Sequence, residues 1–100
     1  MRGTDGTYVG SWYDPNGNAQ QGGLVLTFKG KSVKGELSYF NYRQSVAVVG
    51  SIEADGTFMG TVSDGVEMTD TQGLLTLHDS TLAGRFTFKG ATYLVTGSKG

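Results

Sequence analysis

Three short segments of this 100-residue chain combine side chains that could do chemistry. The segment Tyr39-Phe40-Asn41-Tyr42-Arg43 places aromatic rings beside an amide and a guanidinium group. Tyrosine and arginine are enriched at recognition surfaces because they offer large contact areas together with hydrogen bonds. We therefore take this segment as the leading candidate for ligand binding. The alternative is that its rings only cap the end of the fold.

The segment Asp14-Pro15-Asn16-Gly17-Asn18 spaces oxygen-bearing side chains at alternate positions, as calcium loops do. A complete calcium loop has a glycine at its sixth position and a glutamate at its twelfth, whereas this chain has Ala19 and Val25 there. We therefore expect an Asx-type turn in place of a metal site, with its asparagines and glycine selected for backbone reasons.

The segment His78-Asp79-Ser80 contains the residue types of a catalytic triad. Adjacent residues in a hairpin cannot converge on one point in space, as a triad must. The predicted inward face carries no pair of carboxylates for acid–base chemistry, and no glycine-rich loop leads into a helix for phosphate binding. The sequence therefore predicts a protein that is not an enzyme and that uses no cofactor or metal.

The elements that hold these segments share a repeat: a large apolar residue, any residue, glycine, any residue, and a large apolar residue. It occurs at Tyr8–Trp12, Val33–Leu37, Val48–Ile52, Phe58–Val62 and Leu82–Phe86. In a strand, alternate residues share a face, so each glycine lies beside its two apolar neighbours. Glycine weakens a strand unless its missing side chain is needed, and a small, sharply coiled barrel needs it.

The chain reads as strands joined by tight turns, because no segment has the apolar spacing of a helix. The expected strands are Thr7–Tyr13, Gly23–Lys29, Ser32–Phe40, Ser45–Ala54, Thr57–Ser63, Val66–His78 with a bulge near Asp70–Gly73, Thr81–Lys89 and Ala91–Gly97. Asp55-Gly56 and Asp64-Gly65 are expected to be two-residue hairpin loops. Short loops join neighbouring antiparallel strands. The sequence thus predicts an all-β fold, an eight-stranded antiparallel up-and-down meander barrel forming a single domain over residues 1–100.

Alternation along these strands assigns their two faces. The expected inward residues are Leu24, Leu26, Phe28, Val33, Leu37, Tyr39, Val46, Val48, Ile52, Phe58, Val62, Leu75, Leu77, Leu82, Phe86 and Phe88. The expected outward residues are Lys34, Glu36, Ser38, Ser51, Glu53, Thr61, Arg85 and Thr87, and the apolar Val25, Ala47, Val49, Met59 and Leu74. Because the inward set is bulky, we expect a filled interior in which any cavity is small and apolar.

The two ends of such a barrel differ. The connections at residues 29–31, 55–56 and 78–80 share one end and are all short. The connections at residues 14–22, 40–44, 64–65 and 89–90 share the other end and include the two longest loops. Binding residues are found most often in loops on a rigid scaffold, so we place the site at this long-loop end. The predicted ligand-binding residues are Tyr13, Asn16, Asn18, Gln20, Phe40, Asn41, Tyr42 and Arg43.

The first strand reads Gly10-Ser11-Trp12-Tyr13, which resembles the Gly-x-Trp-Tyr start of the calycin barrels, the lipocalins and avidins. The resemblance implies a calycin-like meander barrel with a large first loop. It does not carry over the biotin-binding activity of the avidins, because their sites use several tryptophans and this chain has only Trp12. The helix of the lipocalins has no counterpart here.

Composition limits the partners. The net charge is −1, with 17% charged residues, which argues against nucleic acid as the main partner. No apolar stretch reaches the roughly 18–20 residues that span a bilayer, so no membrane association is expected.

Two functions remain open. One is a binding module for a small molecule or a peptide at the long-loop end. The other is a protein-interaction or assembly domain that uses the outer wall, which would be a monomer or a homo-oligomer formed through Val25, Ala47, Val49 and Met59. An engineered barrel with no natural ligand is also compatible with the regular glycine repeat.

Overall fold

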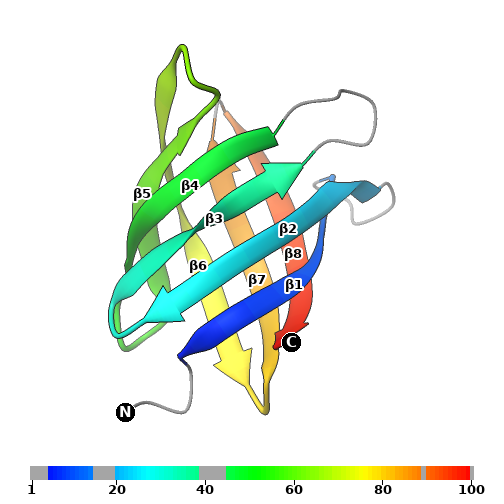
Figure 1. Ribbon diagram of the computed structural model, residues 1–100, viewed down its shortest axis with the longest axis vertical. Helices are drawn as coiled ribbons and strands as arrows, with labels where there is room; N and C mark the ends of the chain where they lie inside the picture. The colour runs from blue at the N-terminus through cyan, green and yellow to red at the C-terminus, as the bar shows by residue number, and fades with distance from the viewer. Residues whose placement is uncertain (1–4, 15–19, 39–44, 89, 100) are drawn as a thin grey trace.

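The computed structural model of the chain is a closed barrel of eight antiparallel strands that follow one another in sequence order (Figure 1). It describes residues 5–14, 20–38, 45–88 and 90–99. The strands are β1 (Gly6–Tyr13), β2 (Gln20–Lys29), β3 (Ser32–Ser38), β4 (Ser45–Ile52), β5 (Thr57–Ser63), β6 (Met68–His78), β7 (Thr81–Phe88) and β8 (Ala91–Lys99). The described part of the chain contains no helix. The predicted all-β, eight-stranded meander barrel is confirmed.

Two predicted hairpin loops are wrong in length. The β4–β5 turn takes up residues 53–56 and the β5–β6 turn residues 64–67, so neither is a two-residue loop. In each turn an aspartate carboxylate accepts backbone N–H groups. Asp55 Oδ1 accepts from Thr57 at 2.9 Å, and Asp64 Oδ1 accepts from Val66 at 2.9 Å and from Glu67 at 2.8 Å. These side-chain hydrogen bonds replace ladder bonds and so end the strands earlier than predicted.

The predicted bulge near Asp70–Gly73 is also wrong. Strand β6 pairs with β5 and β7 without a shift in register. The irregularity lies between β1 and β2, where Trp12 pairs with Gly22 and Tyr13 with Gln20. Alternation along β6 therefore continues unbroken, which buries Thr71. Its hydroxyl donates a hydrogen bond to the Thr87 carbonyl oxygen at 2.9 Å, so this polar group is satisfied within the core.

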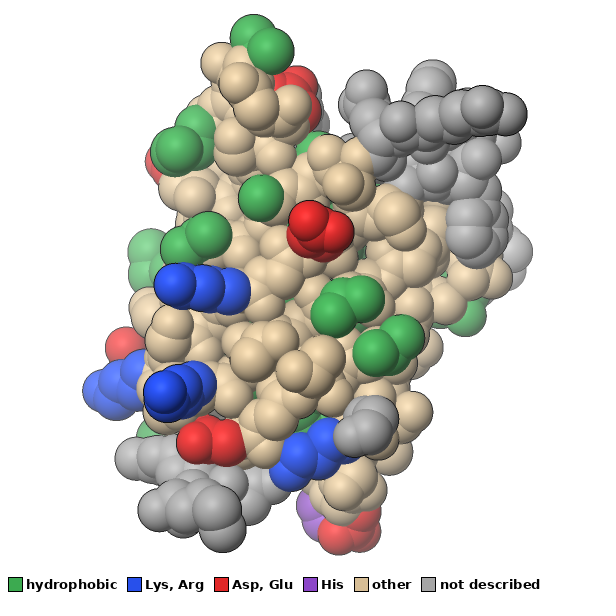
Figure 2. Space-filling view, in the orientation of Figure 1, with side chains coloured by type: hydrophobic (Ala, Val, Ile, Leu, Met, Phe, Trp, Pro, Cys, Tyr) green, Lys and Arg blue, Asp and Glu red, His purple; other side chains and the backbone are tan. Residues whose placement is uncertain are grey.

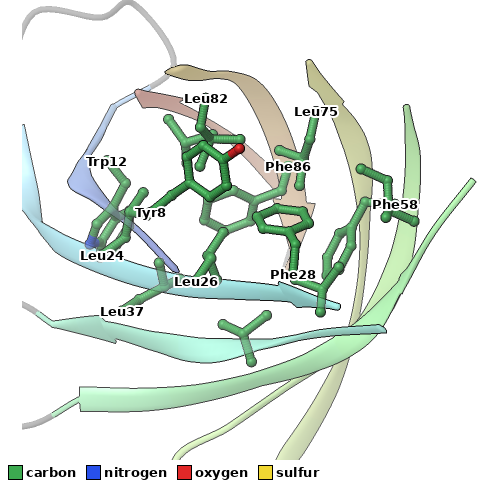
Figure 3. Packing of buried hydrophobic residues seen from close by; sticks show 14 of the residues in the cluster. Tyr8, Trp12, Leu24, Leu26, Phe28, Leu37, Phe58, Leu75, Leu82 and Phe86 are labelled. Carbon is green, nitrogen blue, oxygen red and sulfur yellow. The ribbon is translucent and has the colours of Figure 1, made fainter. Parts of the chain in front are cut away.

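The interior is filled by apolar side chains from every strand (Figure 3). Every predicted inward residue whose side chain is described is buried, except Leu77, which is half-buried at the edge of the core. The side chains of Tyr39 and Phe88 lie outside the described residues. The core also includes residues that the predicted inward set did not contain, namely Tyr8, Trp12, Thr71 and Val95. The ring of Tyr8 meets that of Phe28 edge-on at 5.4 Å.

The five repeated glycines face inward where neighbouring strands come unusually close. A β-carbon on Gly50 would lie 2.8 Å from Cα of Gly60 and 2.9 Å from Cε1 of Phe58. Gly50 and Gly60 are partners across β4 and β5, so the close approach of these two strands depends on the absence of a side chain at both positions. A β-carbon on any of the other three would also overlap the backbone of a neighbouring strand. The repeat thus marks where backbones must approach closely for the barrel to coil and close.

We expect Gly50→Ala to lower the free energy of unfolding by about 1–3 kcal/mol, because the added methyl has no space beside Gly60. Gly23→Ala is the matched control. Its β-carbon would have the Ser38 hydroxyl at 3.3 Å as its nearest neighbour, and we expect a change below about 1 kcal/mol. Urea unfolding followed by circular dichroism measures both. Equal losses of stability in the two variants would contradict this account of the repeat.

Candidate functional site

The structure describes two of the eight predicted ligand-binding residues, Tyr13 and Gln20. The other six lie outside the described residues: Asn16, Asn18, Phe40, Asn41, Tyr42 and Arg43. Tyr13 and Gln20 are partners across β1 and β2 at the long-loop end, so the structure brings these two together.

Tyr13 and Gln20 belong to the outer rim of this end. Trp12 faces the core, so its neighbour Tyr13 faces outward, where it is half-buried opposite Leu94 of β8. Gln20 is exposed, and its Nε2 donates a hydrogen bond to Ser11 Oγ at 2.6 Å. These residues can flank a ligand at the long-loop end, but they do not line the barrel interior.

Three aromatic rings form the layer beneath the long-loop end, and we call Trp12, Phe86 and Tyr93 the aromatic floor. The ring of Tyr93 lies 5.1 Å from that of Trp12 and stacks on that of Phe86 at 5.7 Å, while Trp12 and Phe86 are 6.3 Å apart. Trp12 and Phe86 are buried, and Tyr93 is half-buried. The sequence predicted Phe86 as core but gave no role to Tyr93. Its only signal was its place two residues into a strand after a short turn.

Trp12 is held by hydrogen bonding as well as by packing. Its indole Nε1 donates to the Ser38 carbonyl oxygen at 2.9 Å. The Ser38 hydroxyl also bonds both backbone groups of Gly23, at 3.2 Å to the nitrogen and 3.3 Å to the oxygen. A β-carbon on Gly22 would lie 2.6 Å from the Ser38 carbonyl carbon and 3.1 Å from Nε1 of Trp12. A glycine is therefore required at position 22, and β1, β2 and β3 are joined at this end of the barrel.

The barrel centre offers no room for an organic ligand. The void among the described core residues has a volume of about 20 Å³ and is lined by apolar side chains and Thr71. A void of that size holds about one water molecule, and ligand pockets typically measure roughly 300–1,000 Å³. The predicted filled interior is confirmed, so recognition by the described part of the protein has to use its surface.

Two hollows open on the outside of the barrel at places the sequence did not indicate. One, of about 230 Å³, lies at the short-loop end between the β2–β3 and β4–β5 turns and β6. Its rim carries an ion pair in which Lys31 Nζ lies 3.3 Å from Glu53 Oε2, and both side chains are largely exposed. The other is a shallow groove of about 480 Å³ on the outer wall, bordered by Met59, Asp70 and Gln72. The first lies at the end of the barrel opposite the predicted site, whereas the second reaches Thr87 and Gly90 at the long-loop end.

The described residues show no arrangement suited to metal binding or triad chemistry. None of their His, Cys, Asp and Glu side chains form a group of three or more that could hold a metal ion. His78 Nε2 lies 3.1 Å from Asp79 Oδ2, with both side chains at least 80% exposed where β6 meets the β6–β7 turn at the short-loop end. His78 is thus an exposed residue at the end of β6. The described part of the chain has no helix long and apolar enough to cross a membrane.

Comparison with protein families and curated proteins provides no relative from which residues could be transferred. No protein-family model matches the chain, and no curated protein matches it.

The β4–β5 turn carries the one clear electrostatic perturbation among the described residues. The backbone N–H of Thr57 donates to Asp55 Oδ1 at 2.9 Å. This hydrogen bond, aided by the Thr57 side chain, lowers the pKa of the Asp55 carboxyl below its ordinary value of 3.8. The folded state thus favours the charged carboxylate.

A lowered pKa in the folded state stabilises the protein above the unfolded-state value, and that stabilisation is lost as the pH falls through the folded-state pKa. We therefore expect Asp55→Asn to lower the thermal unfolding midpoint at neutral pH. The difference from the parent protein should shrink as the pH falls through 3.8 and below. Thermal unfolding over this range of pH measures it, and a difference that stays constant would contradict the assignment.

Proposed function

We propose that this protein is a non-enzymatic binding module, a calycin-like barrel that recognises a small molecule or a peptide at its long-loop end. The observation that carries the proposal is the aromatic floor, in which half-buried Tyr93 stacks on Phe86 and contacts Trp12. A partly exposed aromatic ring held by two others is a preorganised surface for a flat apolar group, because little conformational entropy is lost on binding.

The filled interior supports a shallow mode of binding. With a central void of only about 20 Å³, a ligand cannot enter the barrel as it would enter a hollow calycin. It would rest on the aromatic floor and be held from the sides by the flanking loops. The sequence assigns contact to Phe40, Tyr42 and Arg43 of the second long loop, which lies outside the described residues.

Polar residues of the first long loop complete the proposal. Asn16 and Asn18, also outside the described residues, would orient the ligand by hydrogen bonding. Gln20 would do the same from the start of β2, where its amide already bonds Ser11. A rigid aromatic surface with a few polar groups around it is the usual composition of a small-molecule site.

The test is a screen of aromatic fragments and short peptides by native mass spectrometry and amide NMR. We expect binders to shift the amide resonances of Tyr13, Gln20 and Tyr93 and to change the emission of Trp12, which is the only tryptophan. Binders whose shifts cluster instead around Lys31 and Glu53 would move the site to the short-loop hollow and contradict the proposal.

For a ligand found in this way, Tyr42→Ala should abolish binding and leave the mass of the free protein in solution unchanged. Lys31→Ala, at the opposite end, is the control and should bind as the parent does. The physical reason is loss of an aromatic contact at the centre of the recognition surface, which typically costs about 2 kcal/mol or more. Isothermal titration calorimetry on the three proteins decides it.

A second candidate function has its own observation. Apolar side chains stand exposed on the outer wall, among them Val9, Val25, Val49 and Met59. Single exposed apolar residues are ordinary, but neighbours on adjacent strands form the kind of patch that meets a protein. We propose, as the alternative, a protein-interaction domain that uses this wall.

A further inference from the structure

The outer face of β2, β3 and β4 carries a patch that we call the β3 wall, made of Val25, Lys34, Glu36, Ala47 and Val49. All five residues are exposed. Figure 2 shows the barrel in the orientation of Figure 1, with hydrophobic, basic and acidic side chains close together on the visible face. The patch is therefore amphipathic, with charge and apolar surface interleaved.

Strand register fixes how the patch is laid out. Glu36 pairs with Val25 on one side and with Ala47 on the other. Lys34 pairs with Thr27 on one side and with Val49 on the other. Val25 and Val49 are 43% and 50% exposed. The two charges thus stand on the central strand with apolar residues beside them.

The two charges have no ion-pair partner among the described residues of their own chain. Lys34 and Glu36 lie two residues apart on one strand face, at a spacing of roughly 7 Å, with Gly35 between them on the inner face. A positive and a negative charge on either side of Gly35 form a self-complementary pattern. When a second copy is rotated so that its β3 runs in the opposite direction, its Glu36 faces Lys34 and its Lys34 faces Glu36.

We infer that the β3 wall docks on the β3 wall of a second copy of this chain, through a two-fold axis that runs across the strands at the level of Gly35. The inference rests on the second candidate function, the outer-wall interaction domain, and names its partner. In this arrangement Lys34 of each copy faces Glu36 of the other. A two-fold interface is formed by the same patch of both subunits, so each favourable pair of residues occurs twice.

The direction of the axis follows from charge. A two-fold axis parallel to β3 would set Lys34 over Lys34 and Glu36 over Glu36, and facing like charges are costly. An axis across the strands reverses the strand direction in the second copy and pairs opposite charges. On β4 the same axis places Ala47 of one copy against Val49 of the other, so a small side chain meets a larger one.

The area that a dimer needs is a modest share of this barrel's surface. A standard interface buries about 800 Å² on each partner, which is roughly an eighth of this chain's surface of 6058 Å². Three of the eight strands form the wall, and Val9 on β1, paired with Val25, continues its apolar border. The alternation of apolar and charged groups provides both burial and orientation.

The experiment is charge reversal, measured by sedimentation velocity over a range of concentrations. We expect the parent protein to be a dimer in reversible equilibrium with monomer. Lys34→Glu and Glu36→Lys should each raise the dimer dissociation constant at least about tenfold, because each sets like charges face to face. The double variant should return close to the parent value, since its pairs are reversed and still opposite. Arg85→Glu, an exposed cation on β7, is the control and should leave the constant unchanged.

Val49→Lys separates this inference from the function on which it rests. If Val49→Lys dissociates the dimer but the double charge variant does not restore it, the wall is an interface and the two-fold arrangement is overturned. If no wall variant changes the dimer dissociation constant, both the outer-wall function and this inference are contradicted. A parent protein that stays monomeric overturns the inference outright. Circular dichroism of each variant confirms that the barrel is intact.

Discussion

Close approach of neighbouring backbones at the inward glycines is the constraint on which the rest of the structure depends. At Gly50 and Gly60 two Cα atoms face each other where any side chain would collide. Because the strands pass this closely, the sheet coils enough for β8 to pair with β1 and close the barrel. Closure leaves the eight strands of the sheet without a free edge, and it makes the interior narrow enough for side chains to fill.

The filled interior in turn decides where function can lie. A void of about 20 Å³ rules out the deep ligand cavity of larger barrels, so the described part of the molecule offers recognition only at its ends and on its wall. At the long-loop end the buried rings of Trp12 and Phe86 complete the core, and the half-buried ring of Tyr93 packed against them reaches the surface. The hydrogen bond from Trp12 to Ser38 ties this layer to β3 and fixes the position of the indole ring.

The two proposed surfaces are independent of each other. The long-loop end lies at one end of the barrel axis, whereas the β3 wall lies on the side of the barrel (Figure 1). A two-fold axis across the strands would set the two barrels antiparallel, with their long-loop ends directed away from each other. Dimerisation would therefore leave both ligand sites accessible and would present two of them on one particle, which increases the avidity for a multivalent partner.

The sequence by itself determined the fold class, the strand order, most of the inward set and the filled interior. These follow from alternation, turn residues and side-chain volume, which are local or additive properties. Only the tertiary structure decided the four-residue turns at Asp55 and Asp64, the unbroken register of β6 that buries Thr71, and the aromatic floor that includes Tyr93. The physical reason is that hydrogen bonds and ring contacts between distant strands depend on register around a closed barrel. That register is set by all eight strands together.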